Sequence, residues 1–408
     1  MTITRRGMLI GTAGLGMAGL APGWAFAADP SNWEGLLAEA KGKTVYFHAW
    51  GGGEQINAYI GWAAGEMQKR HGFEVRHVQV TDTANVVQTV LAEKTAGKTS
   101  GGSVDLVWIN GENFAAMKRE GLLQARGWAT KLPDYAYVDT KGKPTTTVDF
   151  TIPTDGLEAP WGMAQLVFFY DSAMTAQPPK SASAYLEYAQ VHPGRLAYPQ
   201  PPDFMGSTFL KQILIETIAD PALLQKPLQE ADFDTATAPL FAYLDELTPN
   251  LWRSGKAYPQ NVTALMQLLS DDEIDIAFAF NPSAASNDVE TGALPDTVRG
   301  YVFDGGTIGN THFVAIPFNA SAPAGAMVFA DFLMSPEAQA RKADAAVWGD
   351  PTVLDVANLP PDQKKYFANV TRGVATPSPE ELGRVLPEPH PSWMEAIERA
   401  WTARYGAT

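Results

Sequence analysis

Cysteine is absent from this 408-residue chain. Its absence excludes disulfides, thiol catalysis, zinc–thiolate sites and the attachment of a lipid to an N-terminal cysteine. The fold must therefore rest on its hydrophobic core alone. A chain of this length can bury such a core, and the length favours two domains or lobes rather than one.

Positive charge is also scarce. The chain has 30 lysines and arginines against 45 aspartates and glutamates, which gives a formal net charge of −15. This balance argues against nucleic acid and anionic membrane surfaces as partners. It is typical of a soluble, freely diffusing protein, which we expect to be a monomer. It does not identify a cationic ligand, because the charge of a surface is not the charge of a pocket.

Motifs for catalysis and metal binding are missing as well. The six histidines do not recur at the spacing of a metal-binding helix, and no His-Glu-x-x-His or Gly-x-Ser-x-Gly motif occurs. Residues 92–99 match the loosest form of a phosphate-binding loop, but a predicted helix leads into them and a strand leads out. We interpret them as a surface turn. We expect no metal, no cofactor and no enzymatic activity, although a pair of catalytic carboxylates remains open.

The N-terminus has the pattern of an export signal. Arg5 and Arg6 precede an apolar stretch of small residues, 8–20, and Ala25-Phe26-Ala27 has the form of a cleavage site. The paired arginines resemble a twin-arginine signal. A membrane anchor is the alternative, but the stretch is short and rich in glycine. We predict a signal peptide over residues 1–27 and a periplasmic location for the mature chain.

Strand and helix patterns alternate through the first 120 residues. The predicted strands are 43–48, 73–80 and 104–109, and the predicted helices are 54–70, 83–95 and 112–120. This order favours an α/β fold, with a mainly parallel sheet flanked by helices on both faces.

A stretch rich in proline and threonine, residues 132–160, interrupts this alternation. We expect the chain to cross there into a second lobe and to return later. Further predicted strands are 165–170, 194–198, 274–280, 298–303 and 311–316, and further helices are 209–218, 265–269, 324–334 and 392–404. We assign residues 28–163 and 300–340 to a discontinuous first lobe, 164–299 to the second lobe, and 341–408 to a C-terminal helical region that packs on the lobes.

Several segments resemble bacterial extracellular solute-binding proteins. Residues 332–339, Phe-Leu-Met-Ser-Pro-Glu-Ala-Gln, are similar to a segment near the end of many such proteins, with Ser335 placed to cap a helix and Pro336 at its first position. Residues 104–114, 199–209 and 387–393 resemble the YnjB family of ABC-transporter substrate-binding proteins. This resemblance implies a type II periplasmic-binding-protein fold, in which crossing strands form a hinge between two lobes. It also implies an ABC permease and its ATPase as partners.

Ligands of open α/β sheets bind outside the carboxyl ends of the strands, so two facing lobes would share one cleft. This rule selects the loops that follow the predicted strands. The candidate ligand-binding residues are Trp50, Gly51, Gly52, Asp82, Trp108, Asn110, Asn113, Asp203, Phe204, Gly206, Ser207, Asn281, Gly306 and Thr307.

Each candidate also has a structural interpretation. The glycines after Trp50 can serve a tight turn, or their N–H groups at a helix start can receive an anion. Trp50 and Trp108 can stack on a flat or cationic ligand or belong to the core. Asp203 can pair with an amine or sit in its turn, and Ser207 can be the N-cap of the next helix.

These observations favour a binding protein that captures a small polar, cationic or heteroaromatic solute. Closure of the two lobes over the solute would then present it to the permease. The alternatives are an exported enzyme acting on a small molecule in the same cleft, and a ligand-sensing receptor of the same fold. The lack of a nucleophile–base motif or a metal site argues against the enzyme.

Overall fold

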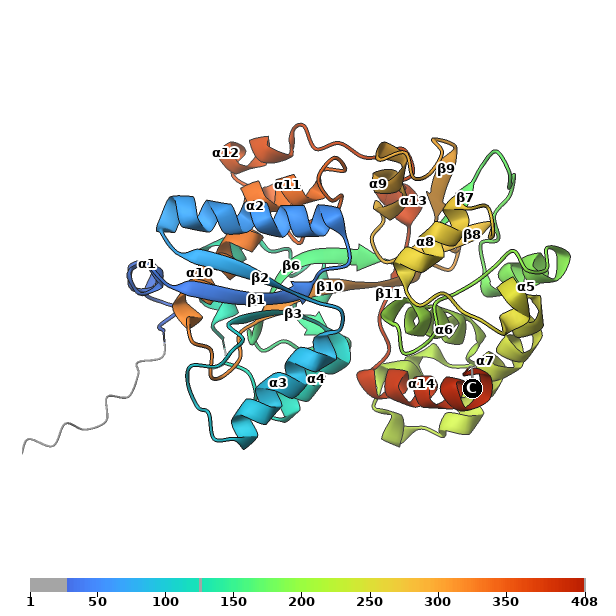
Figure 1. The fold of residues 1–408 in the computed structure, drawn as a ribbon, viewed down its shortest axis with the longest axis horizontal. Coiled ribbons are helices and arrows are strands. Elements are labelled where there is room, and N and C mark those ends of the chain that lie inside the picture. Colours follow the sequence, from blue (N-terminus) through green and yellow to red (C-terminus); the bar gives the residue numbers. More distant parts are fainter. Residues whose placement is uncertain (1–27, 125–126, 407–408) are drawn as a thin grey trace, which may run out of the picture.

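The computed structural model describes residues 28–124 and 127–406. The predicted signal peptide, residues 1–27, lies outside this range. The described residues form two α/β lobes that stand side by side (Figure 1). None of the helices in this part of the chain is long and apolar enough to cross a membrane.

A mixed sheet forms the centre of the first lobe. β2, β1 and β3 run parallel, and β10 lies antiparallel between β3 and β6. The strands are β1 (Thr44–Trp50), β2 (Glu74–Val80), β3 (Leu106–Ile109), β6 (Glu158–Gln165) and β10 (Thr307–Ala315). A small hairpin, β4 (Val148–Asp149) and β5 (Ile152–Pro153), stands beside them. The three strands predicted in the first 120 residues are confirmed to within two residues.

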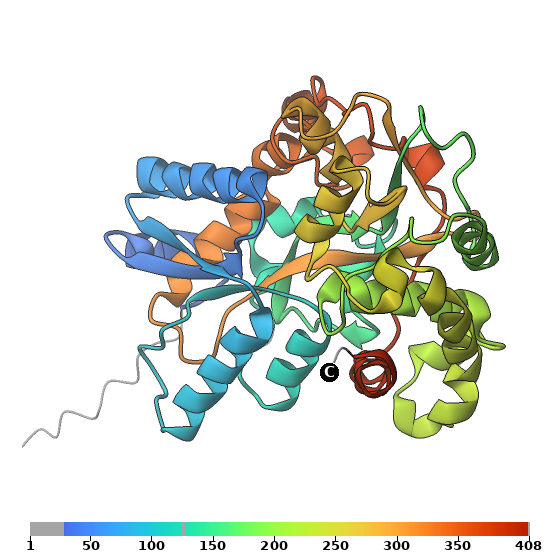
Figure 2. The ribbon, with the colours of Figure 1, turned by 45° about the vertical axis from the view of Figure 1, so that its right-hand side comes forward.

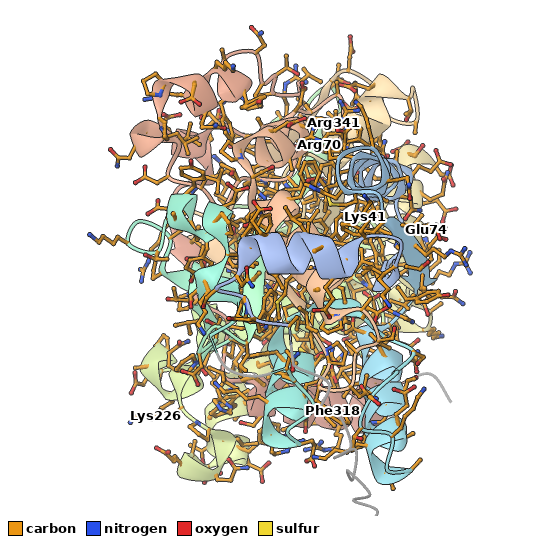
Figure 3. The ribbon with its side chains drawn as sticks, turned by 90° about the vertical axis from the view of Figure 1, so that its left-hand side faces the viewer. Lys41, Arg70, Glu74, Lys226, Phe318 and Arg341 are labelled. Atoms are coloured by element: carbon orange, nitrogen blue, oxygen red, sulfur yellow. The ribbon has the colours of Figure 1, made fainter. Side chains whose placement is uncertain are left out.

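Helices cover both faces of this sheet, as the alternation of patterns predicts. One face carries α1 (Trp33–Ala40), α2 (Glu54–His71) and α10 (Pro323–Met334), and the other carries α3 (Thr83–Thr95) and α4 (Gly111–Arg119). α11 (Pro336–Ala343) and α12 (Pro361–Lys364) follow α10. In Figure 3, α1 crosses in front of this lobe, and the labelled Arg70 and Arg341 mark the contact of α2 with α11. Arg70 is paired there with Glu337 at 2.7 Å.

The helix ends follow from local sequence. α2 stops at Gly72, which has φ +71° and donates its N–H to the carbonyl of Gln68. Glycine adopts this left-handed conformation without strain. The predicted cap of α11 is confirmed, because Ser335 Oγ accepts a hydrogen bond from the N–H of Ala338 at 3.2 Å. Of the segment that we interpreted as a surface turn, residues 92–95 are the last residues of α3, and only residues 96–99 form the turn that follows.

The second lobe has an antiparallel sheet in the order β8-β7-β9. Its strands are β7 (Val167–Asp171), β8 (Ile276–Ala279) and β9 (Val298–Tyr301), and its helices are α5 (Ala182–Val191), α6 (Phe204–Thr217), α7 (Phe233–Leu247), α8 (Val262–Ser270) and α9 (Ala284–Glu290). Stacked rings of Phe168, Phe209, Phe278 and Phe303 fill the core between sheet and helices.

Two sequence predictions need correction in this lobe. Residues 194–198 do not form a strand, because only Leu196 makes a bridge, to Ile276, and its carbonyl accepts the N–H of Trp252. The return to the first lobe also comes later than residue 300. Phe303 still packs in the second core, and the chain leaves that lobe within β10.

The C-terminal region divides between the lobes. Residues up to Leu359 pack on the first core, whereas α13 (Pro379–Leu382), β11 (Val385–Leu386) and α14 (Pro391–Tyr405) belong to the second. β6 and β10 run side by side from one core to the other, as Figure 2 shows for β10. They supply the crossing strands expected of the type II fold.

Candidate functional site

The carboxyl ends of β1 and β3 bring two predicted tryptophans to one edge of the first-lobe sheet. Trp50 is the last residue of β1, and Trp108 lies one residue before the end of β3. Both side chains are half-buried. The ring of Trp50 lies against the following turn, where a Cβ on Gly52 would sit 2.3 Å from it. Gly52 therefore has a packing role next to Trp50.

Trp108 belongs to an aromatic cluster. The cluster consists of Tyr59, Trp108, Trp161, His312 and Trp348. Ring centroids lie 4.9 Å from Trp108 for Trp161, 5.1 Å for His312 and 5.9 Å for Trp348. Trp161 and Trp348 are fully buried, whereas Trp108 and His312 are half-buried. One side of Trp108 thus packs in the core, and its exposed part is available to a flat or cationic ligand.

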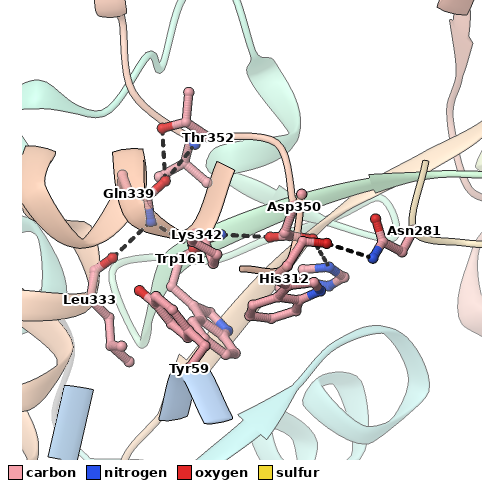
Figure 4. Close-up of polar contacts among 12 residues, drawn as sticks. Tyr59, Trp161, Asn281, His312, Leu333, Gln339, Lys342, Asp350 and Thr352 are labelled. Atoms are coloured by element: carbon pink, nitrogen blue, oxygen red, sulfur yellow. Dashed lines mark hydrogen bonds and ion pairs between the residues drawn. The ribbon is translucent and has the colours of Figure 1, made fainter. Parts of the chain in front are cut away.

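A buried ion pair holds the cluster in place (Figure 4). Lys342 Nζ lies 2.6 Å from Asp350 Oδ2, and His312 Nε2 lies 3.2 Å from Asp350 Oδ1. Lys342 also donates to the carbonyl of Trp161. Burial lowers the pKa of Lys342, while Lys342 and His312 together outweigh burial and lower the pKa of Asp350. The pair thereby links the two crossing strands, since Trp161 lies in β6 and His312 in β10.

Three side chains of the second lobe reach the same cluster. They come from the turn after β8 and from α9, and they donate to backbone carbonyls of the first lobe. Asn281 and Asn287 donate to Trp348 at 3.4 and 3.1 Å, and Ser283 donates to Gly349 at 2.9 Å. These bonds bring the two lobes together at the aromatic cluster.

Three predicted site residues are linked through intermediate residues in this region. Trp108 packs on Trp348, whose carbonyl accepts the side chain of Asn281. Asn281 follows Phe280, and the ring of Phe280 meets Phe204 edge to face at 5.3 Å. Trp108, Phe204 and Asn281 are all half-buried. The region between the lobes therefore presents aromatic and amide groups from both sides.

A second group of side chains between the lobes is strongly acidic. This interlobe acidic cluster comprises Glu112, Glu388 and Glu398, with Lys211 as the cation beside them. Glu112 comes from α4 of the first lobe, and the other two carboxylates lie beside α6 of the second. Negative charge is therefore in excess where the lobes meet.

Lys211 forms the centre of the acidic cluster. Its Nζ lies 2.6 Å from Glu388 Oε2, and both side chains are almost completely buried. Asn310 of β10 donates to the other oxygen of Glu388 at 3.2 Å. The ammonium also lies 4.8 Å from the ring centre of Phe150 and 5.4 Å from that of Phe204. Since Phe150 belongs to the first lobe, this cation–π contact also joins the lobes.

Glu112 faces this centre from the first turn of α4 and is half-buried. Burial raises its pKa to about 7, and the carboxylates of Glu398 and Glu388 add to the rise, whereas Lys211 opposes it. Burial likewise raises the pKa of Glu398, whose Oε1 accepts a hydrogen bond from Ser207 Oγ at 2.5 Å. The two lobes thus place like charges opposite each other.

Two further carboxylates are more deeply buried. Asp149 accepts the N–H of Gly111 at 2.8 Å, but its second oxygen has no hydrogen-bond partner among the described residues, and neither oxygen of Glu158 has one there. Burial raises the pKa of both groups well above the usual range. Burial therefore favours the neutral form of both groups.

Asp203 and Ser207 have structural roles at the start of α6. Asp203 is the N-cap, and its carboxylate accepts the N–H groups of Met205 and Gly206. Ser207 lies inside the helix and is not the cap, because the helix begins earlier than predicted, at Phe204. A Cβ on Gly206 would meet the carbonyl of Pro199 at 2.3 Å. Their contact with a ligand remains a prediction.

The remaining candidates fall into two groups. The side chain of Asp82 caps α3, and the buried hydroxyl of Thr307 accepts a hydrogen bond from Gln165. Gly306 has φ +95° and lies close to the carbonyl of Arg384. These three residues therefore have structural roles in the fold. Others stay near the interlobe region. The carbonyl of Gly51, next to Trp50, accepts a hydrogen bond from Asn57, and the side chain of Asn113 donates one to Glu112. Asn110 lies directly before α4 and is half-buried, and its side chain does not cap the helix.

The sequence analysis missed most of the charged groups between the lobes. Glu112 stood inside a segment we singled out, and Lys211 lies four residues after Ser207 on the same helix. Spacing along α6 is the one local signal that marks Lys211 as a neighbour of Ser207. Glu388 also lies inside a segment we singled out, residues 387–393, whereas His312 and Trp348 carry no such signal, because their partners are distant in sequence. Within the described ranges, no group of three histidines or carboxylates is placed to hold a metal ion.

Comparisons with known proteins agree with this architecture. A family model described as bacterial extracellular solute-binding protein matches residues 62–371. The chain is 44% identical to protein YnjB of Escherichia coli K12 over 390 residues, which cover 96% of this chain and 98% of YnjB.

Solved structures share the fold at low identity. AfuA from Actinobacillus pleuropneumoniae, a periplasmic binding protein solved with fructose-6-phosphate, has a TM-score of 0.61 at 14% identity, covering 90% of this chain and 100% of AfuA. PotD from Streptococcus pneumoniae, a spermidine/putrescine ABC transporter substrate-binding protein, has a TM-score of 0.60 at 14% identity, covering 89% and 96%. The chain belongs to the bacterial extracellular solute-binding proteins of ABC-transporter type.

Proposed function

We propose that this protein is the periplasmic substrate-binding component of an ABC importer and that it captures a small cationic solute, aliphatic or heteroaromatic, between its lobes. The observation that carries the proposal is the interlobe acidic cluster, in which three carboxylates, Glu112, Glu388 and Glu398, lie around Lys211. A bound cation would offset this excess of negative charge. The adjacent aromatic cluster supplies ring faces that attract the same class of ligand.

The half-buried side chains would make the contacts. Trp108 from the first lobe and Phe204 from the second would stack on the solute, while Asn110 and Asn281 would hydrogen-bond to it. Glu112 would pair with its positive charge. Because these groups come from both lobes, the complete set is available only when the lobes are together. A solute would therefore shift the population toward the closed form.

Structural relatives are associated with ligands of both signs. PotD is named for spermidine and putrescine, which are cations, whereas AfuA was solved with fructose-6-phosphate, which is an anion. The acidic cluster of this chain favours the first class. The fold alone does not choose between them.

A thermal-shift screen of residues 28–408 tests the ligand class. Spermidine, putrescine and thiamine serve as cations, and fructose-6-phosphate serves as the anion. A solute at ~100 times its Kd adds about 2.7 kcal/mol to the free energy of unfolding. We expect a shift with a cation alone. A shift with the anion alone would overturn the cation assignment, and chemical conversion of a hit would favour an enzyme. Copurification with an ABC permease tests the importer role.

Trp108→Ala should weaken binding of the cationic hit at least about tenfold, because a desolvated cation–π contact contributes about 2 kcal/mol. Trp108→Phe should retain most of the affinity. The measurement is isothermal titration calorimetry. Trp252→Ala is the matched control, since Trp252 is also half-buried but lies in the second lobe and donates to Glu273. Equal losses in the two alanine variants would contradict a ligand role for Trp108.

Glu112→Gln should flatten the pH dependence of stability. The pKa of Glu112 is raised from 4.5 to about 7 in the folded state, so folding favours its protonated form. The stability that this raised pKa gives to the folded state is complete below pH ~4.5 and is lost as pH rises toward 7. We expect the variant to gain about 1 kcal/mol over the native chain between pH 5 and pH 8. Urea unfolding at the two pH values measures this.

Glu120→Gln is the control for this variant. Glu120 follows the same helix, α4, at its exposed end and pairs with Arg119 on the surface. It should leave the pH profile unchanged. If Glu112→Gln behaves in the same way, Glu112 does not titrate in the interlobe region as described.

A further inference from the structure

A groove lies on the second lobe and shares no residue with the aromatic or acidic clusters. Its volume is about 1210 Å³. Residues 299–304, which include the end of β9, line it continuously, and residues 176–181 and 372–377 form its walls. One wall is tightly packed on the strand, because a Cβ on Gly300 would sit 2.5 Å from the carbonyl of Ala375. Figure 1 shows β9 next to β7 and α13 in this lobe.

β9 is an edge strand. Its register pairs residues 298–301 with residues 171–168 of β7, and no other strand of the described chain pairs with it. An edge strand presents unpaired N–H and C=O groups, which can accept an additional strand from a partner. A groove that runs along such an edge has the shape for an extended peptide.

The groove is positively charged, in contrast to the chain as a whole. Its cations are Lys180, Arg299, Arg372 and Arg384, against the carboxylates Asp304 and Glu381. Arg299 donates to backbone carbonyls, while the other three cations make no ion pair with any described residue. Hydrogen bonds with Ser378 lower the pKa of Glu381, and the charges of Arg372 and Lys180 add to this lowering.

An apolar side chain is also exposed in the groove. Val374 lines it and is 52% exposed. It is one of six large hydrophobic side chains that are exposed in the described chain. The groove therefore offers an exposed apolar contact beside its basic residues.

We propose that this groove binds an extended acidic peptide segment of a partner protein, which adds along the free edge of β9. Backbone hydrogen bonds to β9 would supply the register, and alternate side chains would face the apolar and the basic residues. Lys180, Arg372 and Arg384 would pair with the acidic residues of the segment. The proposal is independent of the solute site, because the two regions share no residue.

The probe is a labelled synthetic peptide of about ten residues in which Glu and Val alternate, matched to a strand's two faces. We expect saturable binding in fluorescence anisotropy, weakened by salt, and slower hydrogen exchange at residues 299–303. The double variant R372A/R384A should bind about tenfold more weakly. The control K69A/R399A removes two exposed cations elsewhere and should bind normally. A Lys-Val peptide should not bind.

Other outcomes would overturn the proposal. Equal binding by R372A/R384A and the control would remove the role of the basic residues. Binding of inorganic pyrophosphate at the same affinity, without protection of β9, would indicate a small-anion site instead. The thermal shift with the cationic solute should persist in both double variants, so failure of the groove and failure of the solute site are distinguishable.

Discussion

Lys211→Met should lower the free energy of unfolding by about 3–5 kcal/mol, because it leaves buried charge without its partner. Glu388 is almost completely buried, lies 2.6 Å from Lys211 and has Asn310 as its remaining polar contact. The substitution also removes the cation that opposes Glu112 and Glu398. Urea unfolding followed by tryptophan fluorescence measures the change.

A second variant separates loss of the charge from loss of packing. Glu388→Gln in the Lys211→Met background removes the orphaned charge and should restore more than half of the lost stability. Arg399→Met is the matched control, since Arg399 pairs with Glu395 on the surface of α14, and it should cost less than about 0.5 kcal/mol. If Lys211→Met costs no more than this control, the buried pair is not formed.

Gly162→Ala should lower the free energy of unfolding by about 3 kcal/mol, because overpacking adds to the disruption of a buried ion pair. A Cβ at this position of β6 would lie 2.2 Å from Asp350 Oδ2 and 2.5 Å from Lys342 Nζ. The pair must then separate or the crossing strand must shift. Either change should also alter the fluorescence of Trp161, whose carbonyl accepts from Lys342.

Gly61→Ala provides the control for this result. Gly61 lies within α2, and a Cβ there would have no neighbour within 4 Å. Alanine favours a helix over glycine, so this variant should be neutral or up to about 1 kcal/mol more stable. A harmless Gly162→Ala would show that the ion pair can move away from β6 without cost, contrary to the packing described.

Local sequence patterns predicted much of the fold. α3 came from apolar residues spaced on one helix face and α10 from a continuous apolar run, and each segment carries its pattern within itself. The strand predicted over residues 194–198 failed because pairing depends on a distant partner, and Leu196 finds only Ile276. The return to the first lobe was placed too early for a similar reason. The hydrophobicity of a segment predicts that it is buried, but it does not reveal which of the two cores the segment enters.

The candidate site was predictable only in part. The rule for strand ends located Trp50 and Trp108, because it depends on chain order alone. It could not reveal that Ser207 meets Glu398, 191 residues away, or that Lys211 meets Glu388, 177 residues away. Asp203 shows that a local pattern can also be ambiguous, since a polar residue before a helix is equally suited to binding a ligand and to capping the helix.

The continuity of β10 affects how a solute can drive closure. Ile308 of this strand is buried in the second core and Val314 in the first, and the register with β6 shifts between His312 and Phe313. We expect a bend of one lobe relative to the other to turn about this irregularity. Contacts at His312 would hardly change when the lobes bend, so we expect them to contribute equally to the open and closed forms. Groups farther from the strand, such as Glu112 and Phe204, would move most between the two forms, so we expect their contacts to contribute most to the preference of a solute for the closed form.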